Sequence, residues 1–349
     1  MQARFKDEKE AEKRRRKNEE STILWLAKTL KMDDEEIKKV LKRVRDNSRP
    51  YKTILVKKRS GGKRELTIPY PLLKKIQRKI NKRILCDFPV AENVYGFSGG
   101  NILDAIKPHL GARSILCVDI KNAFPSISFF QVFNFLTEGR EVEYATLMNE
   151  KSQYLWYGPY HRAIVDFKPG YLSWYAARII TQLVTSKNQL PQGAPTSPKL
   201  FDLFCKPLDE RLNEFAIKVR GTYTRYADNI FFSMPEEKFP KPIINAVSHR
   251  MRKEGFVPHK FKTGSINGEA LRILGLNLIN RKIHNTRDFK RALRLSIHHV
   301  NWLIDNGKRD TPEFEKAWQK LRGQMNFARI DTLPPKLLND YLELEKQLK

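Results

Sequence analysis

Cysteine is scarce in this sequence. The chain of 349 residues contains three cysteines, Cys86, Cys117 and Cys205, which lie far apart and form no C-x-x-C pair. An odd number of separated cysteines predicts reduced thiols and argues against both a disulfide framework and a structural zinc site. The seven histidines do not cluster with the cysteines. If the protein binds a metal, we therefore expect a hard ion held by carboxylates.

Long apolar runs are also missing. No stretch of about 18 apolar residues occurs, and the mean hydropathy is negative, which argues against a membrane-spanning helix. The first 20 residues are mostly charged and contain no apolar core typical of a signal peptide. We therefore expect a cytoplasmic protein with no membrane partner.

Acidic residues are few relative to basic ones. Lys and Arg total 66 against 39 Asp and Glu, a formal net charge of +27, and the excess is spread along the chain. The positive electrostatic field of such a protein favours a polyanionic partner. Cations that neutralise phosphates release the counterions condensed on them, and this release contributes to affinity. A generally basic soluble protein is the alternative. The length is sufficient for two or three subdomains around a sizeable core.

The N-terminal part of the sequence combines helical and strand patterns. The first 20 residues are expected to be a solvated charged arm or a frayed helix, and apolar spacing predicts two amphipathic helices within residues 21–44. Residues 51–58 alternate as a strand, Ser60-Gly61-Gly62 is a turn, and residues 64–68 return. This part therefore predicts a small helical element followed by a basic β-hairpin.

The rest of the chain mixes strands and helices. We expect a basic helix at 71–86, a buried strand at 114–120, mostly helical structure with an aromatic-rich middle at 129–188, a hairpin at 221–234, a helix at 240–254, a strand at 271–279 and a basic helical tail from 287. The strand at 114–120 carries Asp119 near its end, and the later hairpin turns through Ala227-Asp228-Asn229. Antiparallel hairpins mixed with helices indicate an α+β fold rather than a doubly wound sheet.

Two aspartates have the placement that nucleotidyl transfer requires. That reaction uses two divalent ions about 3.5–4 Å apart, which activate the attacking hydroxyl and neutralise the leaving pyrophosphate. Mg²⁺ prefers oxygen ligands and keeps waters, so a few carboxylates on adjacent strands are sufficient. Asp119 at a strand end and Asp228 at a hairpin tip could converge on one site. Either aspartate taken alone would be read first as an ordinary turn residue, because Asp is common in turns.

A series of motifs strengthens this interpretation. In order, the chain contains Val-Asp119-Ile-Lys-Asn-Ala-Phe124, Leu-Pro-Gln192-Gly193-Ala-Pro-Thr-Ser-Pro198, Tyr226-Ala-Asp228-Asn229 and Leu274-Gly275-Leu276. Together these resemble motifs A, B and C and the primer grip of reverse transcriptases, in the prokaryotic retron and group II intron branch. Upstream, residues 57–65 resemble the first fingers motif, and downstream, residues 320–327 resemble the thumb of retron enzymes. The resemblance covers most of the chain from Tyr51 onward.

The resemblance implies a role for each motif residue. It implies two Mg²⁺ ions, with Mn²⁺ able to substitute, and the ligands Asp119, Ile120 and Asp228; Asp119, Asp228 and Asn229 form the catalytic set. Phe124 would be the aromatic gate that leaves no room for a 2′-hydroxyl, with an ordinary core position as the alternative. Nucleotide-binding roles are further implied for the following residues: Lys63 and Arg64 of the fingers, and Gln192 and Gly193 of motif B.

The sequence also departs from its relatives. Asn229 occupies the place of the second aspartate of the usual Tyr-x-Asp-Asp motif, and an amide brings no charge to the metals. We nevertheless expect activity, because the two principal ligands are retained. The retron motifs Asn-Ala-x-x-His and Val-Thr-Gly are matched only in part, by residues 105–109 and 273–275.

These observations predict a right-hand polymerase. We expect an N-terminal helical extension at 1–50, fingers at 51–112, a palm at 113–284 with finger helices inserted at about 129–188, and a helical thumb at 285–349. The predicted function is RNA-directed DNA polymerase, which copies a noncoding RNA into DNA from dNTPs in antiviral defence, with an effector protein or a homo-oligomer as a further partner. A retron enzyme that makes RNA-linked single-stranded DNA is the second hypothesis, and a catalytically inactive nucleic-acid-binding scaffold is the third.

Overall fold

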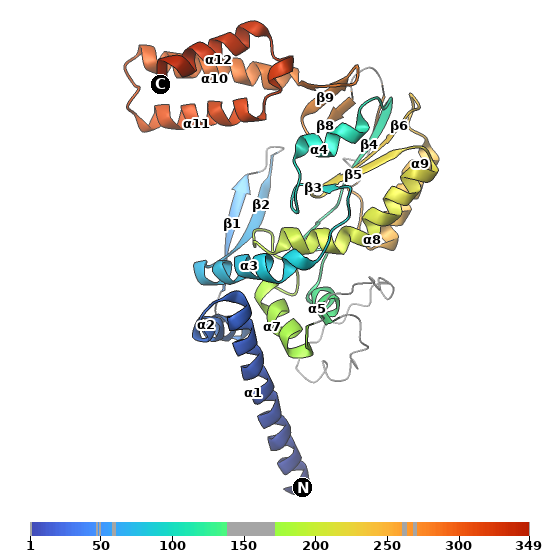
Figure 1. Cartoon of the computed structure of the whole chain (residues 1–349), viewed down its shortest axis with the longest axis vertical. Coiled ribbons are helices and arrows are strands. Elements are labelled where there is room, and N and C mark those ends of the chain that lie inside the picture. The colour runs from blue at the N-terminus through green and yellow to red at the C-terminus, as the bar shows by residue number, and fades with distance from the viewer. Residues whose placement is uncertain are drawn as a thin grey trace.

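The computed structural model describes residues 2–46, 48, 50–57, 61–137, 172–259, 264–267 and 271–348. Helices alone form the two ends of the chain, and strands alternate with further helices between them (Figure 1). The α+β prediction is therefore confirmed. The predicted aromatic-rich stretch within 138–171 lies outside the described residues.

The chain begins with two helices, as the apolar spacing predicts. Helix α1 (Gln2–Leu30) includes the charged start of the sequence and projects away from the rest of the molecule (Figure 1). Helix α2 (Asp34–Arg45) begins after Asp33, whose carboxylate accepts a hydrogen bond from the Glu35 backbone N–H at 3.1 Å. Such an N-cap satisfies one of the free N–H groups at the helix start. It fixes the break between the two helices.

The predicted basic hairpin follows. Strand β1 (Tyr51–Lys57) pairs antiparallel with β2 (Lys63–Pro69), and the residues at the tip, 58–60, lie outside the described part. Helix α3 (Pro71–Arg83) begins with proline in its first turn, where the missing N–H costs nothing. A short 3₁₀ turn at Leu85–Asp87 replaces the predicted last turn of this helix.

A five-stranded sheet forms the centre of the molecule. Its strands lie in the order β3 (Val94–Tyr95), β5 (Thr222–Tyr226), β6 (Asn229–Met234), β4 (Ser114–Asp119) and β7 (Gly264–Asn267). The pairs β5–β6, β6–β4 and β4–β7 are antiparallel, whereas β3 pairs parallel with β5. The expected wholly antiparallel sheet is therefore wrong at this edge, where two residues are too few for the sequence to indicate a strand.

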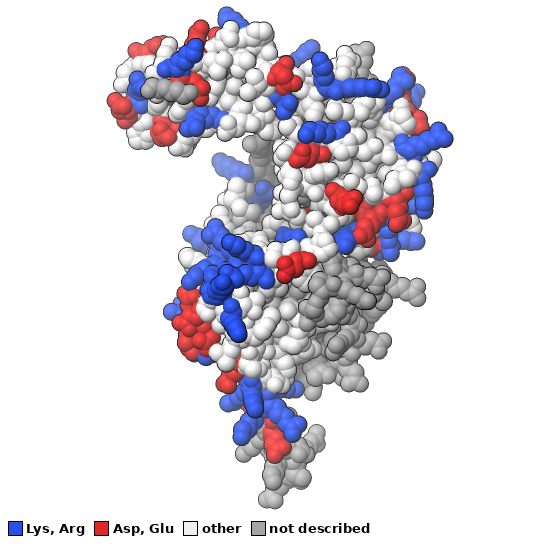
Figure 2. Space-filling view, viewed as in Figure 1, with Lys and Arg blue, Asp and Glu red and all other residues white. Residues whose placement is uncertain are grey.

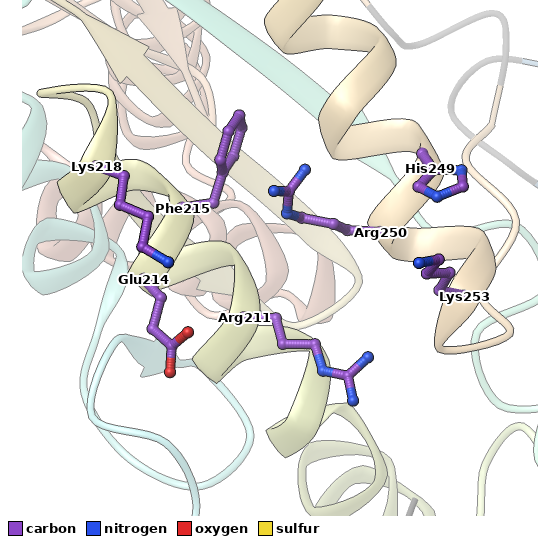
Figure 3. Close-up of a pocket in the computed structure, with 7 residues that line it drawn as sticks. All are labelled: Arg211, Glu214, Phe215, Lys218, His249, Arg250 and Lys253. Carbon is purple, nitrogen blue, oxygen red and sulfur yellow. The ribbon is translucent and has the colours of Figure 1, made fainter. Parts of the chain in front are cut away.

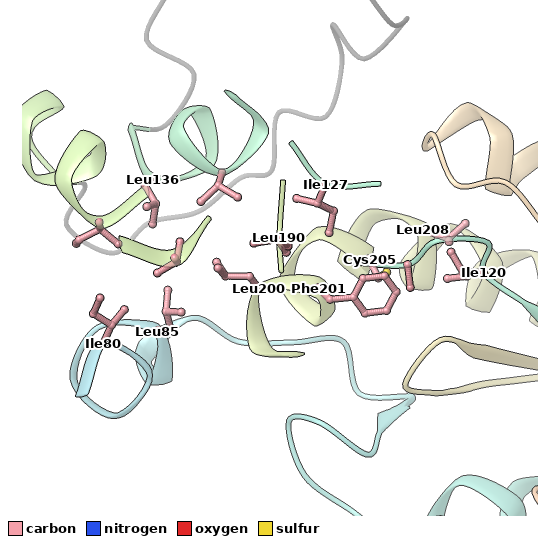
Figure 4. Packing of buried hydrophobic residues seen from close by; sticks show 14 of the residues in the cluster. Ile80, Leu85, Ile120, Ile127, Leu136, Leu190, Leu200, Phe201, Cys205 and Leu208 are labelled. Carbon is pink, nitrogen blue, oxygen red and sulfur yellow. The ribbon is translucent and has the colours of Figure 1, made fainter. Parts of the chain in front are cut away.

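The two faces of the sheet are covered by different elements. Helices α5 (Phe129–Thr137), α7 (Trp174–Val184), α8 (Ser197–Lys218) and α9 (Lys241–Lys253) form one large apolar core with one face, and Figure 4 shows part of it around Phe201 and Leu208. Helix α4 (Ile102–Ile106) and the strands after β7 pack on the other face, against Ile115 and Phe231. Alternation of side chains along β4 and β6 supplies both cores.

A second sheet of three strands replaces a predicted single strand. Strands β8 (Leu271–Ile273), β9 (Leu276–Ile279) and β10 (Lys282–Asn285) pair antiparallel in the order β10-β9-β8. The chain turns at Leu274 and Gly275, whose φ angles are 48° and 82°. Positive φ at both central residues is the signature of a tight type I′ hairpin. The expectation of one strand at 271–279, with Gly275 inside it, is wrong.

Three helices end the chain, as the basic tail predicts. Helix α10 (Arg287–Asp305) begins after Thr286, whose hydroxyl accepts a hydrogen bond from the Phe289 backbone N–H. Helices α11 (Pro312–Phe327) and α12 (Pro335–Leu348) pack on α10 around their own apolar cluster. The surface is hollowed between these helices and the β1–β2 hairpin (Figure 2).

Candidate functional site

Strand register brings the two predicted metal ligands together. Asp119 ends β4 directly opposite Asn229, the first residue of β6. One residue further on, the Ile120 N–H donates to the Asp228 carbonyl at 2.8 Å. The backbone thus places Asp119, Ile120 and Asp228 next to one another at one end of the central strands.

The Asp119 strand end is also fixed from its other side. The His259 N–H donates to the Asp119 carbonyl at 2.7 Å, and the Lys121 N–H donates to the Val257 carbonyl at 2.9 Å. These bonds attach the segment after α9 to the end of β4. They limit how far the Asp119 backbone can move.

The turn that carries Asp228 has an unusual backbone. Ala227 has φ of 54°, a region that residues with a side chain rarely occupy. Two hydrogen bonds hold it there: its N–H donates to the Tyr95 carbonyl at 3.1 Å, and its carbonyl accepts from the Arg225 guanidinium at 2.8 Å. The turn is therefore held by hydrogen bonds to both backbone polar groups of Ala227.

Arg225 is the centre of a buried ionic network. Its side chain is fully buried and binds Asp209 with two hydrogen bonds and Asp202 with one, each at 2.8 Å. Tyr223 donates to Asp209 at 2.5 Å, and Ser98 donates to Asp202 at 2.6 Å. Burial by itself raises the pKa of the Asp209 carboxyl, and the charge-assisted bonds from Arg225 favour its ionised form.

His109 occupies a second buried position behind the same hairpin. Its Nε2 lies 2.8 Å from the Thr224 hydroxyl, and its Nδ1 lies 2.7 Å from the Ser233 hydroxyl. Because the Thr224 hydroxyl donates to the Ala105 carbonyl, it accepts from His109, which places the ring proton on Nε2. Burial lowers the pKa of His109 to about 3, so the ring is neutral at neutral pH. This histidine joins β5 and β6.

Four of the five predicted nucleotide-binding residues line a cavity of about 550 Å³. They are Arg64, Phe124, Gln192 and Gly193. The fifth, Lys63, is exposed and is not among the lining residues. Two cations of α3, Lys74 and Arg78, line the same cavity and were missed by the motif analysis. Their spacing of one helical turn, in a helix without acidic residues, is the signal that could have found them.

Phe124 lies between the core and this cavity. Its ring centroid is 5.7 Å from that of Phe97 and 5.5 Å from that of Phe201, and its side chain is half-buried. Phe201 is fully buried, whereas Phe97 is 40% exposed. Phe124 therefore has one side supported by the core and another open to the cavity.

The loop with Gln192 and Gly193 is fixed to the β1–β2 hairpin. The Thr67 N–H donates to the Gln192 carbonyl at 2.8 Å. Gly193 has φ of 126°, and a Cβ at this position would lie 3.1 Å from the Thr67 carbonyl oxygen. Only glycine allows this close approach at that φ without strain. Gly193 thus lets β2 approach the loop, in addition to lining the cavity.

The residues around Asp119 and Asp228 fit a hard divalent cation. Within the described ranges, no group of three or more His, Cys, Asp or Glu side chains could hold a metal. Two carboxylates are nevertheless what Mg²⁺ typically takes from a protein, because it keeps waters and binds substrate phosphates. The Asn229 amide donates to the Asp228 carboxylate at 3.0 Å. It therefore contacts a predicted ligand through its nitrogen.

A family model and curated relatives agree with the motif analysis. A family model described as reverse transcriptase (RNA-dependent DNA polymerase) matches residues 56–278. The chain is 31% identical to the Retron Mx162 reverse transcriptase of Myxococcus xanthus, over 82% of this chain and 58% of that protein. It is 29% identical to the Retron Ec86 reverse transcriptase of Escherichia coli, over 77% of this chain and 74% of that protein.

A solved structure of telomerase from Candida albicans, in complex with a fragment of telomeric RNA, is also similar. Its TM-score is 0.43 and its sequence identity 15%, over 72% of this chain and 50% of that one.

The chain spans less than two thirds of the length of the Mx162 protein. In the part of the chain that is described, no helix is both long and apolar enough to cross a membrane.

Proposed function

Because the chain belongs to the reverse transcriptase family, we propose that it is an RNA-directed DNA polymerase that copies a noncoding RNA into DNA from dNTPs. One observation carries the proposal. The β4–β6 register and the Ile120–Asp228 hydrogen bond set Asp119 beside Asp228 at the end of the central strands. The proposed fingers (51–112), palm (113–284) and thumb (285–349) then form the right hand around the hollow between β1–β2 and α10–α12.

The carboxylates of Asp119 and Asp228, with the Ile120 carbonyl, would hold two Mg²⁺ ions, or Mn²⁺ in their place. When bound, the ions supply activation of the primer hydroxyl and neutralisation of the pyrophosphate. Asn229 would orient the Asp228 carboxylate through its amide hydrogen bond. Because this role needs no charge, the proposal includes retained activity despite the missing second aspartate.

The cavity residues would bind the incoming nucleotide. Arg64, Lys74 and Arg78 supply positive charge where the triphosphate is expected, and Lys63 precedes Arg64 in β2. Phe124 would lie under the sugar, where its ring leaves no room for a 2′-hydroxyl. Gln192 would contact the nucleotide beside Gly193. These side chains come from the hairpin, α3 and motif B, so the site would be complete only when the fingers and palm are together.

The proposed catalytic pair is tested by replacing each carboxylate. We expect Asp119→Ala and Asp228→Ala to abolish Mg²⁺-dependent dNTP incorporation on a primed RNA template while RNA binding remains, because phosphate affinity is distributed over many Lys and Arg. Asp305→Ala, at the exposed end of α10, is the matched control and should behave as wild type. Full polymerisation by either palm variant would remove the assigned site.

The names of the relatives favour one form of this activity. Both relatives described above are retron reverse transcriptases. The second candidate is therefore a retron enzyme whose single-stranded DNA stays joined to its RNA. The test is to treat the labelled DNA product with ribonuclease and to compare its gel mobility before and after. A change in mobility, with ribonucleotide still joined to the DNA, would support this candidate. Action in antiviral defence, and association with an effector protein or a second copy of the chain, stay predictions.

A further inference from the structure

A basic hollow lies between α8 and α9, away from the proposed nucleotide cavity. Arg211 and Lys218 from α8 and Arg250 and Lys253 from α9 surround a cavity of about 260 Å³ (Figure 3). Among the described residues, Glu214 is the one carboxylate that lines it. The residues of the nucleotide cavity are all different. Four cations on two helices therefore share a second site.

Two of the four cations are held in place by the protein. The Arg250 guanidinium lies 3.8 Å from the centre of the Phe215 ring and donates to the Ala246 carbonyl at 3.1 Å. Arg211 forms an ion pair with Glu254, whose side chain is 7% exposed. Stacking and ion pairing reduce the entropy that each side chain would lose on binding a ligand. This part of the hollow is preorganised.

The other two cations are available. Lys218 and Lys253 are exposed, and neither forms an ion pair with a carboxylate of the described residues. Glu214 lies one helical turn before Lys218, yet the two side chains are not paired in the described structure. No paired carboxylate of the described residues offsets the charges of Lys218 and Lys253, whereas a bound anion would offset them. The arrangement suits a polyanion.

The hollow is remote from the catalytic turn. Lys218 ends α8, and the chain passes through Gly221 directly into β5, whose five residues lead to that turn. At roughly 3.3 Å per residue, the strand alone spans about 16 Å. A nucleotide bound beside Asp228 does not reach Lys218. Any nucleic acid that contacts both places must extend along the palm.

The size and lining of the hollow indicate the kind of ligand. Small-molecule pockets usually measure about 300–1,000 Å³ and are mainly apolar, whereas this one is smaller and lined mainly by charged groups. Guanidinium and ammonium groups around an open hollow fit backbone phosphates, which carry affinity without sequence specificity. A net charge of +27 points to the same class of partner.

We propose that the α8–α9 hollow binds backbone phosphates of an RNA segment that lies outside the catalytic cleft. This proposal rests on the proposed function, because the RNA it concerns is the RNA that the enzyme copies or carries. Arg250 and Arg211 form the fixed part of the site, and Lys218 and Lys253 close on the phosphates. The site would hold the RNA on the palm while another part of it occupies the cleft.

The test compares the salt dependence of RNA binding. The variant Lys218→Gln/Lys253→Gln and the wild type are titrated against a labelled RNA with several hairpins, by fluorescence anisotropy, at a series of KCl concentrations. Each lost phosphate contact lowers the slope of log K against log salt by about 0.7–0.9. We expect the double variant to lose about 1.4–1.8 from the slope. Incorporation of dNTPs on a short primed template that fills only the cleft should be unchanged.

The control is Lys39→Gln/Lys42→Gln, which removes two exposed cations from α2. It should keep the wild-type slope. A wild-type slope for Lys218→Gln/Lys253→Gln, or an equal loss in the control, overturns the proposal. If Lys218→Gln/Lys253→Gln weakens the binding of poly-glutamate but not of RNA, the proposal is overturned in favour of an acidic protein partner. Failure of the proposed function would give another result. The wild type would then make no DNA, whatever the slope of its RNA binding against salt.

Discussion

Arg225→Lys tests whether the buried network positions the catalytic turn. The substitution keeps one positive charge between Asp202 and Asp209 but replaces the planar fork, so the four hydrogen bonds of Arg225 cannot all form. The carbonyl of Ala227 is the acceptor that the shorter ammonium is expected to lose. The turn would then lack one of the two bonds that hold its positive φ.

The expected size of the effect follows from two opposing energies. An alanine at positive φ costs about 1–2 kcal/mol, and a hydrogen bond from a charged donor contributes about 1.5–3 kcal/mol. The bond from Arg225 therefore roughly offsets the strain at Ala227. Without it, the native turn should lose population by about tenfold or more, since 1.4 kcal/mol is a factor of ten. The rate of dNTP incorporation should fall by a similar factor at saturating Mg²⁺ and dNTP.

A second substitution separates positioning from simple loss of stability. Glycine adopts positive φ without strain, so Ala227→Gly should be nearly silent alone and should restore part of the activity of Arg225→Lys. The assay is a double-mutant cycle of single-turnover rates, with the melting temperature of each variant measured in parallel. Arg225→Lys with a wild-type rate, or a double variant no faster than Arg225→Lys, would refute the reasoning.

Two further predictions concern a buried ring and the proposed sugar gate. His109 has a folded pKa of about 3, below its usual value of 6.5, so its stabilising effect is complete above pH 6.5 and is lost as the pH falls toward 3. Comparing denaturant unfolding of wild type and His109→Gln, we expect the wild type to lose roughly 2 kcal/mol more between pH 6.5 and 5. Phe124→Ala should raise the ratio of ribonucleotide to deoxyribonucleotide incorporation measured with matched rNTP and dNTP; an unchanged ratio would assign Phe124 to the core alone.

Local patterns predicted the elements that carry the proposed metal ligands. The apolar run before Asp119 and the polar turn between two apolar strands at Asp228 are short-range signals, and both strands formed as expected. The strand predicted at 271–279 was wrong because Leu274 is a residue that rarely adopts positive φ, so Leu274-Gly275 lacks the Asn-Gly or Asp-Gly pattern typical of a type I′ turn. The backbone there is determined by packing of Leu271, Ile273 and Leu276 in one apolar cluster.

The buried network could not be predicted from the sequence. Asp202 and Asp209 lie on one face of α8, and Arg225 lies on the next strand, but apolar periodicity does not indicate which polar side chains are buried together. Their meeting depends on the packing of α8 against β5, which is a tertiary contact. The same limit applies to Ser98, which reaches Asp202 from a loop far away in the sequence.

Asn229 is where the chain departs most clearly from its relatives, and Asn229→Asp tests what the amide does. The substitution removes the donor to Asp228 and adds a third carboxylate beside Asp119. Three carboxylates repel one another without a cation but attract Mg²⁺ more strongly, so activity should survive and the Mg²⁺ concentration for half-maximal rate should fall. The control is Asn229→Ala, which loses the donor without adding charge. This variant should not lower the Mg²⁺ concentration for half-maximal rate. If Asn229→Asp instead needs more Mg²⁺, or loses its rate at saturating Mg²⁺, the orientation of Asp228 by the amide outweighs the added charge.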